Sequence, residues 1–574
     1  MIDRENKTYD YQRLRQHIAQ SVADSLTVDV SEVTIEEADK TKIAADLALP
    51  CFRFARQLKA SPQEIASGLA VKLHIPEAAS IEALSGYLNI KLQPDYLAST
   101  LLNDTQLHKT YGFISQTEPE TVVVDFIGLN LAKPFSVGHL RPTVQGWALV
   151  NLYRALGYNV VGDNHLGDWG TPFGMWAAAF TLWGDEAKLA EDGVYELGRL
   201  YVLFRKESKD KPELLDEAKA WLKKLEAQDS EAVVLQERFS AISIAHMHEV
   251  LRRLDITPDE NIGESFYIPK VKAYLDDLIA RGIAIEQDDG TIIVKLEEYD
   301  IETPILLRKS DGSYLYASTD ILTIDYRIER WKPKKIIYSV GQEQQFHFKQ
   351  VFALADKLGY SVELEHAWFG LIEEIDEDGN RRKMSSRSGI SYLEQLLDLA
   401  ESKARSMLPD DSEVSDNDIR LIANAAIKFS DFSQSRKLNI LFDWNTMFSL
   451  TGYSGPYLQY AAVRARAILQ KAEQVGDTKS VTTEGYDWEA EHELLWLAYR
   501  YPRELEAAAT QNEPFVIAAY CFELAKALNR YYENHQVLSA EHDVREKRLW
   551  TVGLIEGILT SALGILGIYV PERM

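Results

Sequence analysis

Residues 121–141 read TVVVDFIGLNLAKPFSVGHLR: a strand-like apolar run breaks into a glycine-containing loop, and a helix-like stretch follows as far as residue 156. A buried strand that feeds such a loop and then a helix N-terminus directs backbone N–H groups and the positive end of a helix dipole at a bound anion. Gly138 has no side chain to hold a base or a phosphate away, and His139 offers a donor in the first helical turn. The stretch predicts a nucleotide site, although alone it fits an ordinary strand-to-helix connection equally well.

A second strand follows this helix. Residues 158–162 read YNVVG and run directly into DNHLGDWG at residues 163–170. Polar and glycine residues therefore crowd the ends of two neighbouring strands. In an open parallel sheet, ligands bind in the crevice at the carboxyl ends of the strands. The second strand thus strengthens the prediction of a nucleotide-binding α/β sheet.

A third segment, KMSSRSG at residues 383–389, lies far along the chain from the first two. It follows DEDG at residues 376–379, a hairpin-type turn signal, so we predict an exposed and mobile basic loop. Such a loop suits phosphoryl chemistry, because its charge can close on a triphosphate when the transition state needs it. A solvated basic turn is the alternative for this segment taken alone.

Together the three segments resemble the signature motifs of class I aminoacyl-tRNA synthetases, and their wording is closest to the arginyl-tRNA synthetase family. That family's motifs read roughly S-P-N-x-x-K-P-x-H-x-G-H-L-R, N-H-x-G-D-W-G-T-Q-F-G and K-M-S-K-S. The residues that match the first two are Asn130, Lys133, Pro134, Gly138, His139, Leu140, Arg141, residues 164–171, Phe173 and Gly174. The departures are Gly128 and Leu129 for Ser-Pro, Ser136 for the first His, Pro172 for Gln and Ser386 for the second Lys.

The resemblance implies a divided ATP site. Its catalytic and ATP-binding residues would be Lys133, Ser136, Gly138, His139, His165, Asp168, Lys383, Met384 and Ser385. In many family members that lack the second loop lysine, a lysine just upstream of the first motif's histidine is thought to supply the missing charge, and Lys133 holds that place here. The role of Ser136 stays open, since a hydroxyl can donate to a phosphate but cannot carry the charge of an imidazolium.

The resemblance also implies an amino-acid pocket for arginine. Its residues would be Asp125, Asn130, Tyr316, Asp320 and Gln344, with Thr319 in place of a usual Arg. A guanidinium is a planar fork of donors that stays charged, and carboxylates placed for paired hydrogen bonds recognise it best. Asp125 and Asp320 meet that need, whereas a surface acid or a helix cap is the alternative for either aspartate taken alone.

The last third of the chain has a helical pattern, and Gly455-Pro456 opens one of its helices. On that helix Tyr457, Tyr460 and Arg464 fall on one face, where they could stack on splayed bases or simply pack in a core. Residues 452–468 resemble the anticodon-binding helical domain of the arginyl family. The resemblance places these three residues, together with Tyr532 and the terminal Met574, against the anticodon.

Composition limits the remaining possibilities. The two cysteines, Cys51 and Cys521, suggest neither a disulfide framework nor a zinc site, and residues 1–8 carry no signal or transit pattern, so we expect a cytoplasmic protein. A net charge of -26 means that any RNA recognition depends on local basic clusters. The apolar residues 549–568 could nearly span a membrane, but Glu556 near their centre favours a buried helix of a soluble bundle.

We therefore expect an α/β fold of three parts. An α+β N-terminal domain at residues 1–115, which in the family reaches the tRNA, precedes a Rossmann-like parallel-sheet catalytic domain at 116–400 with a helical insertion at about 175–290. An all-α anticodon-binding bundle occupies 401–574. Two hairpins are predicted at residues 283–296 and 304–318, each with an Asp-Gly turn. His246 and His248 are predicted to be surface or core residues and not metal ligands.

The function that the resemblance implies is that of an arginine-tRNA ligase. The expected substrates are L-arginine, ATP as its Mg²⁺ complex and tRNA(Arg). No zinc or other protein-bound metal and no membrane partner is expected, and the chain is expected to be a monomer. Family members usually activate arginine only with tRNA bound. The alternatives are a class I synthetase for another amino acid and a non-catalytic tRNA-binding relative.

Overall fold

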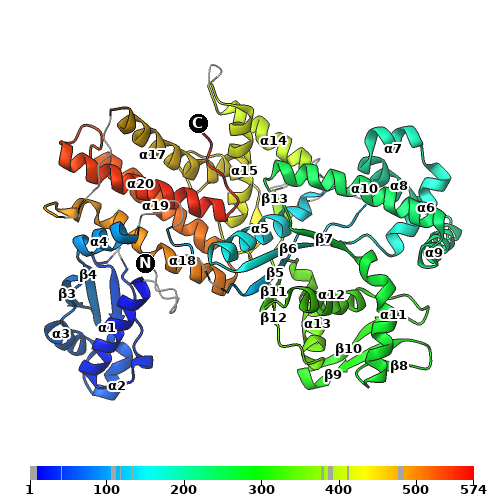
Figure 1. Cartoon of the computed structure of the whole chain (residues 1–574), viewed down its shortest axis with the longest axis horizontal. Helices are drawn as coiled ribbons and strands as arrows, with labels where there is room; N and C mark the ends of the chain where they lie inside the picture. The colour runs from blue at the N-terminus through cyan, green and yellow to red at the C-terminus, as the bar shows by residue number, and fades with distance from the viewer. Residues whose placement is uncertain are drawn as a thin grey trace. The chain divides into compact units, whose positions relative to one another are not determined.

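The computed structural model describes residues 10–574 apart from 40–41, 105–110, 115, 117, 132–133, 376–379, 385–391, 410–412, 476–481 and 483. The chain forms two compact units. Figure 1 labels helices and strands of both. Unit 1 consists of Met1–Gln116, Leu458–Gln511 and Val516–Gly564. Unit 2 consists of Thr117–Tyr457, Asn512–Phe515 and Ile565–Met574.

The core of unit 2 is a parallel five-stranded sheet. Its strands are β5 (Thr121–Asp125), β6 (Asn159–Leu166), β7 (Glu260–Gly263), β11 (Lys335–Tyr338) and β12 (Glu363–His366). The strand order is β12-β11-β5-β6-β7, so the direction of winding reverses between β5 and β11. In open α/β sheets ligands bind outside the carboxyl ends of the strands at such a switch point. The predicted Rossmann-like core is confirmed, and its ligand crevice is expected beyond Asp125 and Tyr338.

Helix α5 (Leu140–Ala155) connects β5 to β6, as the opening stretch of sequence predicts. It is buried along almost its whole length. Gly146 allows the helix to approach the end of β5 closely, because a Cβ atom at this position would lie 2.2 Å from Cβ of Phe126. The close contact fixes the helix N-terminus, which follows His139, at the carboxyl end of the sheet.

A group of helices separates β6 from β7. They are α6 (Thr171–Trp183), α7 (Glu186–Asp192), α8 (Val194–Glu207), α9 (Glu213–Glu226) and α10 (Ser230–Arg253). The sequence predicts an insertion as far as about residue 290, but β7 pairs in parallel with β6 and α11 (Glu264–Ala280) follows directly. The helical insertion therefore ends at α10, and residues 260–280 belong to the nucleotide fold.

Two antiparallel hairpins follow α11, as predicted. They are built by β8 (Ile285–Glu286), β9 (Ile292–Leu296) and β10 (Ile301–Arg308), with a further bridge between Arg308 and Tyr314. Gly290 and Gly312 adopt φ angles of 82° and 87°, the left-handed backbone that an Asp-Gly turn requires. Helices α12 (Tyr316–Trp331) and α13 (Gln345–Lys357) then flank β11 in the chain.

The remaining elements of unit 2 include a small sheet and three helices. The sheet has the order β14-β13-β15, with β13 (Ile372–Ile375), β14 (Arg381–Lys383) and β15 (Ile440–Leu441). The helices are α14 (Leu393–Ser406), α15 (Asp416–Phe432) and α16 (Trp444–Met447). Ser415 caps α15, because its hydroxyl accepts a hydrogen bond from the N–H of Asp418. These helices group with the catalytic core and not with the helices after residue 458.

Unit 1 joins an α+β domain to a helical bundle. The α+β domain contains α1 (Asp10–Leu26), β1 (Glu36–Glu37), β2 (Leu47–Pro50), α2 (Ala55–Leu58), α3 (Pro62–Lys72), β3 (Ala78–Leu84), β4 (Tyr87–Leu92) and α4 (Pro94–Asp104). The bundle contains α17 (Gly455–Val475), whose first three residues lie in unit 2, with α18 (His492–Gln511), α19 (Phe515–Asn534) and α20 (His542–Ile565). Asp10 links the two parts, because it accepts hydrogen bonds from the hydroxyls of Tyr96 and Tyr499.

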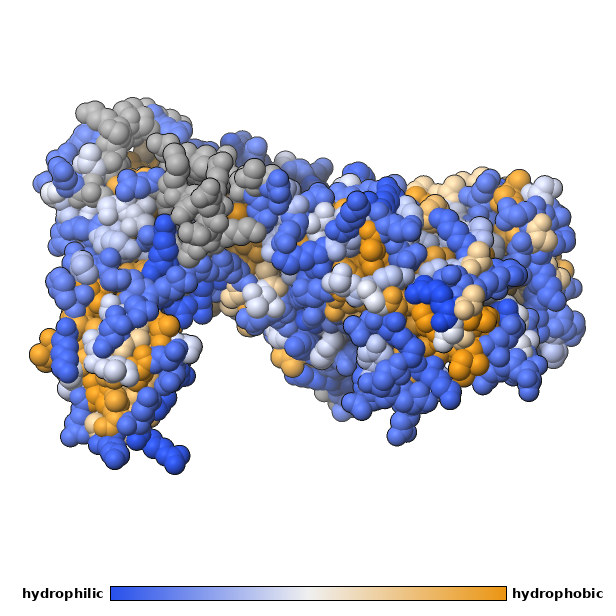
Figure 2. Space-filling model, turned by 60° about the horizontal axis from the view of Figure 1, so that its bottom comes forward, coloured by the Kyte–Doolittle hydropathy of each residue, from blue (hydrophilic) through white to orange (hydrophobic). Residues whose placement is uncertain are grey.

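Helix α20 is long and apolar enough to cross a membrane, but 61% of its most apolar window is buried inside the protein. Arg466 pairs with Glu556 at 3.0 Å, which satisfies the one carboxylate near the helix centre. The predicted buried bundle helix is confirmed. Hydrophilic residues cover most of the face shown in Figure 2, and hydrophobic residues form separate areas among them.

Candidate active site

The first signature segment ends in a short 3-10 turn, η3 (Val137–His139), before α5 begins. The ring of His139 stacks on Phe135 with centroids 5.3 Å apart. Its Nδ1 atom accepts the backbone N–H of Ser136 at 3.2 Å and lies 2.9 Å from the hydroxyl oxygen of Ser136. A backbone N–H can only donate, so Nδ1 is an acceptor and the neutral ring carries its proton on Nε2. Gly138, the middle residue of this turn, is exposed.

Parts of the predicted ATP site lie outside the described residues. This applies to Lys133 and Ser385, and to the predicted turn at residues 376–379. The backbone of Lys383 ends β14, which pairs with β13, and the N–H of Met384 donates to the carbonyl of Ile372 at 2.9 Å. The third segment therefore begins as a strand at the edge of the small sheet.

The second signature segment contributes His165 and Asp168. His165 lies in β6, and neither of its buried ring nitrogens has a hydrogen-bond partner within the described part of the chain. Asp168 accepts hydrogen bonds from the N–H of Ser265 at 2.8 Å and from its hydroxyl at 2.5 Å. Asp168 therefore holds the first turn of α11, a structural task that the sequence does not indicate.

Asp125, a predicted arginine ligand, lies at the end of β5 with 7% of its surface exposed. Its Oδ2 accepts a hydrogen bond from Nη2 of the fully buried Arg327 at 2.6 Å, and the same guanidinium binds Asp163 at 2.7 Å. Burial raises the pKa of Asp125, and the charge of Arg327 opposes that shift. The guanidinium beside Asp125 thus belongs to the protein's own α12.

Tyr316 and Asp320 lie one turn apart at the start of α12. Tyr316 is 63% exposed, and Oδ2 of Asp320 lies 2.6 Å from Nε2 of His347. Gln344 is exposed in the turn η5 (Gln342–Gln344) that follows β11. Asn130 is also exposed and forms a bridge with Gly167, so the loops after β5 and β6 continue side by side.

Glu264 lies near the predicted site residues Asp320 and Asp168, although no motif in the sequence points to it. It is 8% exposed at the start of α11, directly after β7. Burial, followed by the neighbouring charges of Asp320 and Asp168, raises its pKa to about 8. Burial, with Glu264 and Asp320 as further causes, also raises the pKa of Tyr316. Glu264, Asp320 and Tyr316 are therefore close enough to influence one another electrostatically, and together they form an acidic environment that favours a bound cation.

The predicted anticodon residues occur in both units. In unit 1 Tyr460 is 43% exposed, and the guanidinium of Arg464 lies over the ring of Tyr532, 4.8 Å from its centroid. In unit 2 the N–H of Tyr457 donates to the hydroxyl of Ser454 at 3.2 Å. Met574 ends a segment that the N–H of Glu572 holds to Asp418 at 2.9 Å. Both the stacked pair and the exposed ring are compatible with base stacking.

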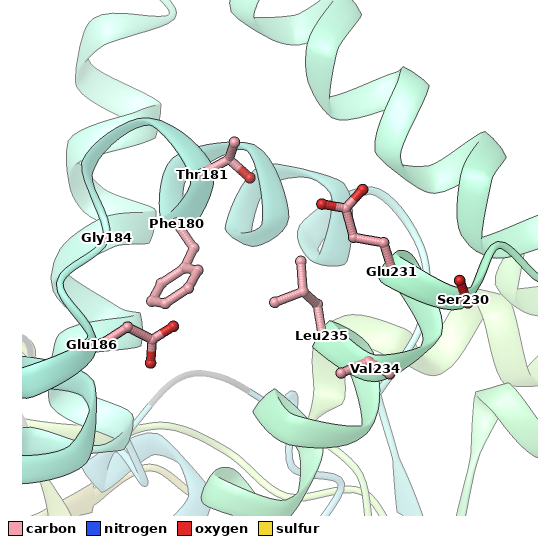
Figure 3. Close-up of a pocket in the computed structure, with 8 residues that line it drawn as sticks. All are labelled: Phe180, Thr181, Gly184, Glu186, Ser230, Glu231, Val234 and Leu235. Atoms are coloured by element: carbon pink, nitrogen blue, oxygen red, sulfur yellow. The ribbon is translucent and has the colours of Figure 1, made fainter.

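One cavity, of about 630 Å³, lies within the helical insertion (Figure 3). Its lining residues are Phe180, Thr181, Gly184, Glu186, Ser230, Glu231, Val234 and Leu235. None of the predicted site residues is among them. Phe180 and Leu235 supply apolar side chains, and Glu186 and Glu231 supply carboxylates, so the lining offers no cation for a phosphate.

Three family profiles match the chain in succession. That described as "Arginyl tRNA synthetase N terminal domain" matches residues 12–92, "tRNA synthetases class I (R), catalytic domain" matches 97–444, and "DALR anticodon binding domain" matches 458–574. Together with the parallel sheet and its signature segments, these matches define a class I aminoacyl-tRNA synthetase.

Similar proteins identify the family within this class. "Arginine--tRNA ligase" of an Exiguobacterium species is 36% identical over 97% of this chain and 98% of its own length. The enzyme of the same name from Halothermothrix orenii is 34% identical over the whole of both chains. The chain belongs to the arginyl-tRNA synthetase family. The predicted family and class of enzyme are confirmed.

Solved structures show the same fold. The arginyl-tRNA synthetase of Thermus thermophilus superimposes with a TM-score of 0.78 at 22% identity, covering 98% of this chain and 100% of that one. The enzyme of Plasmodium falciparum superimposes with a TM-score of 0.79 at 21% identity, covering 98% of each chain.

Proposed function

We propose that the chain attaches L-arginine to tRNA(Arg) in two steps. The carboxylate of arginine attacks the α-phosphorus of ATP, which arrives as its Mg²⁺ complex, and pyrophosphate leaves. The 2′-hydroxyl of the terminal adenosine then attacks the carbonyl of the arginyl-adenylate, and AMP leaves. The observation that supports arginine as the substrate is the pair of carboxylates, Asp320 and Glu264, beside Tyr316 at the sheet's carboxyl edge.

The guanidinium of the substrate would bind between Asp320 and Glu264. Charge on Glu264 is disfavoured by burial and by Asp320 and Asp168, and a bound cation reverses that preference. The fork of donors matches carboxylates, and the hydroxyl of Tyr316 can accept a further hydrogen bond. Asn130 and Gln344 would orient the amino acid, and Asp125 would act on the pocket through Arg327.

The triphosphate would lie over the first signature segment. His139 would donate through Nε2–H, the tautomer compatible with its bonds to Ser136, and Gly138 would let the nucleotide approach the backbone. Lys133 and Lys383 would supply the positive charge that the pentavalent phosphorus needs, with Met384 and Ser385 continuing the third segment. His165 lies in β6 with its ring nitrogens available to a ligand or a water molecule.

The anticodon would stack on Tyr457, Tyr460, Arg464, Tyr532 and Met574. Recognition by these few side chains is compatible with a net charge of -26, because it does not depend on bulk attraction. We propose that the protein acts in the cytoplasm as a monomer.

The experiment is radioactive pyrophosphate exchange into ATP, run with purified protein and tRNA(Arg). We expect exchange with arginine, and none with lysine or with citrulline. Citrulline has the shape of arginine but replaces the guanidinium with an uncharged urea group, so it tests whether the carboxylates read charge. Failure with arginine and tRNA(Arg) together would contradict the proposed function, and equal rates with citrulline would contradict the proposed pocket.

A further inference from the structure

The segment that begins α14 is paired with the first signature segment. Ser136 and Tyr392 form an antiparallel bridge, and the N–H of Leu393 donates to the carbonyl of Phe135 at 2.7 Å. Ser136 in turn contacts His139. The position of residues 392–393 therefore bears on the position of the proposed phosphate-binding histidine.

Side chains of the helical insertion contact the same end of α14. The hydroxyl of Tyr195 in α8 donates to a carboxylate oxygen of Glu394, and its ring meets Tyr392 edge-on with centroids 5.3 Å apart. From α10, Nδ1 of His246 lies 3.7 Å from the other carboxylate oxygen of Glu394. Tyr195 and His246 also contact each other, with ring centroids 5.6 Å apart.

A second contact between the insertion and α14 lies further along this helix. Nη2 of Arg253, at the end of α10, lies 2.8 Å from carboxylate oxygens of both Asp398 and Glu401. These two acids and Glu394 are spaced i, i+4 and i+7, hence on one face of α14. One face of this helix is thus bound by three side chains of the insertion, and Figure 1 shows α10 running up to α14.

Helix α8 also touches the first signature segment directly. Gly198 lies three residues after Tyr195, so both face the same side of α8. A Cβ atom at Gly198 would lie 3.1 Å from Cδ of Pro134, closer than most real Cβ contacts. The same face of one helix therefore contacts Pro134 on one side and Tyr392 and Glu394 on the other.

We propose that α8 of the insertion is a positioning element for adenylate formation, in which Tyr195 and Gly198 hold residues 392–394 and 134–136 in register. The inference deepens the proposed function and rests on it. Phosphoryl transfer depends on preplaced groups, and a displacement of about 1 Å can cost on the order of 100-fold in rate. Tyr195 and Gly198 touch no substrate in this proposal. They act through Ser136 and His139.

The first test removes single contacts. Tyr195→Phe keeps the ring and deletes the hydroxyl, and Glu394→Gln keeps the shape and deletes the charge. We expect each to lower kcat of pyrophosphate exchange by roughly tenfold, the scale of one hydrogen bond to a charged group, with KM for arginine within about twofold. Both changes act on the one contact between Tyr195 and Glu394, so their effects on kcat should not add in the double variant.

The second test separates activity from stability. Gly198→Ala places a better helix former within α8, which favours the fold, but its methyl group displaces Pro134. We expect an unchanged or higher melting temperature together with an exchange rate lowered by about fivefold or more. Glu186→Gln is the matched control: it weakens the Arg238–Glu186 pair inside the insertion, beside the cavity of Figure 3, and should leave exchange within about twofold.

Wild-type exchange rates in both Tyr195→Phe and Gly198→Ala would overturn the positioning role. So would a loss that cooling restores in step with the folded fraction, since that loss reports stability alone. Absence of exchange in the unaltered protein with arginine and tRNA(Arg) would instead overturn the proposed function, and this inference with it. The unaltered protein therefore distinguishes the two failures.

Discussion

The hydroxyl oxygen of Ser136 lies 2.9 Å from Nδ1 of His139, and the backbone N–H of the same serine reaches that nitrogen at 3.2 Å. Ser136 stands where most relatives are expected to have a histidine, so its function is not obvious from the motif. The geometry gives it one: two donors converge on Nδ1 and leave the ring proton on Nε2. Ser136 thus acts on the orientation and tautomer of its neighbour.

Ser136→Ala is expected to lower kcat of pyrophosphate exchange about fivefold. The change removes one hydrogen bond, worth about 1 kcal/mol, while the backbone N–H still holds the ring. Ser136→Thr keeps the hydroxyl and should retain most of the activity. ¹⁵N resonances of His139 provide a second readout, in which Nδ1 stays unprotonated in all three proteins. A protonated Nδ1 in the wild type would contradict this account.

Glu264 predicts that arginine binding releases a proton near neutral pH. Its carboxyl, with a pKa of about 8 in the free protein, is mostly protonated at pH 7, and a guanidinium placed beside it favours the charged form. Calorimetric titration in two buffers of different ionisation enthalpy measures the released proton. Glu264→Gln should abolish the release and weaken arginine binding. Identical heats in both buffers for the wild type would contradict the placement of the guanidinium.

The same carboxyl also predicts how stability depends on pH. The folded state holds the proton up to about pH 8, whereas the unfolded chain loses it near pH 4.5, so the contribution of Glu264 to stability falls as pH rises between these values. The slope is at most about 1.4 kcal/mol per pH unit. Glu264→Gln should therefore gain stability relative to the wild type between pH 5 and pH 8, measured as paired urea unfolding curves without arginine.

Several parts of the fold could be predicted from local signals in the sequence. Ser415 begins α15, and the Asp-Gly turns lie in the hairpins after α11, because caps and turns depend on a few adjacent residues. Glu264 was missed because it follows β7, a strand of only four residues whose identity depends on pairing with β6. A strand that short has no periodicity of its own to separate it from the preceding helices.

Contacts between residues far apart in the sequence could not be predicted from it either. Asp125 and Arg327 are 202 residues apart, so the sequence could identify the acid at the strand end but not the cation that faces it. For the same reason the C-terminal bundle is predicted from residue 401, whereas the helices before residue 458 group with the catalytic core. Asp431 in α15 binds Nε of Arg141 at 2.9 Å, and this buried pair joins α15 to α5 and the catalytic sheet. Periodicity alone groups α15 with the helices that follow it.

The buried guanidinium of Arg327 is expected to contribute strongly to the stability of the fold. Arg327→Met would leave Asp125 and Asp163 facing each other without a cation, a loss of about 3–5 kcal/mol in the free energy of unfolding. Arg330→Met is a matched control on the same helix, because its partner Glu260 is partly exposed and the pair should be worth less than about 1 kcal/mol. Equal effects of the two variants in urea unfolding would show that burial of the pair is immaterial.

Tyr460 tests the proposed contact with the anticodon. Its ring is 43% exposed on α17, so removing it should cost little stability. Base stacking on an aromatic ring is worth roughly 1–3 kcal/mol, and Tyr460→Ala should therefore raise KM for tRNA(Arg) by about tenfold or more, with KM for arginine and ATP unchanged. Tyr460→Phe keeps the stacking face and should behave like the wild type in aminoacylation assays. If phenylalanine is as harmful as alanine, the hydroxyl and not the ring is what the tRNA contacts. If neither variant changes KM, the anticodon lies elsewhere.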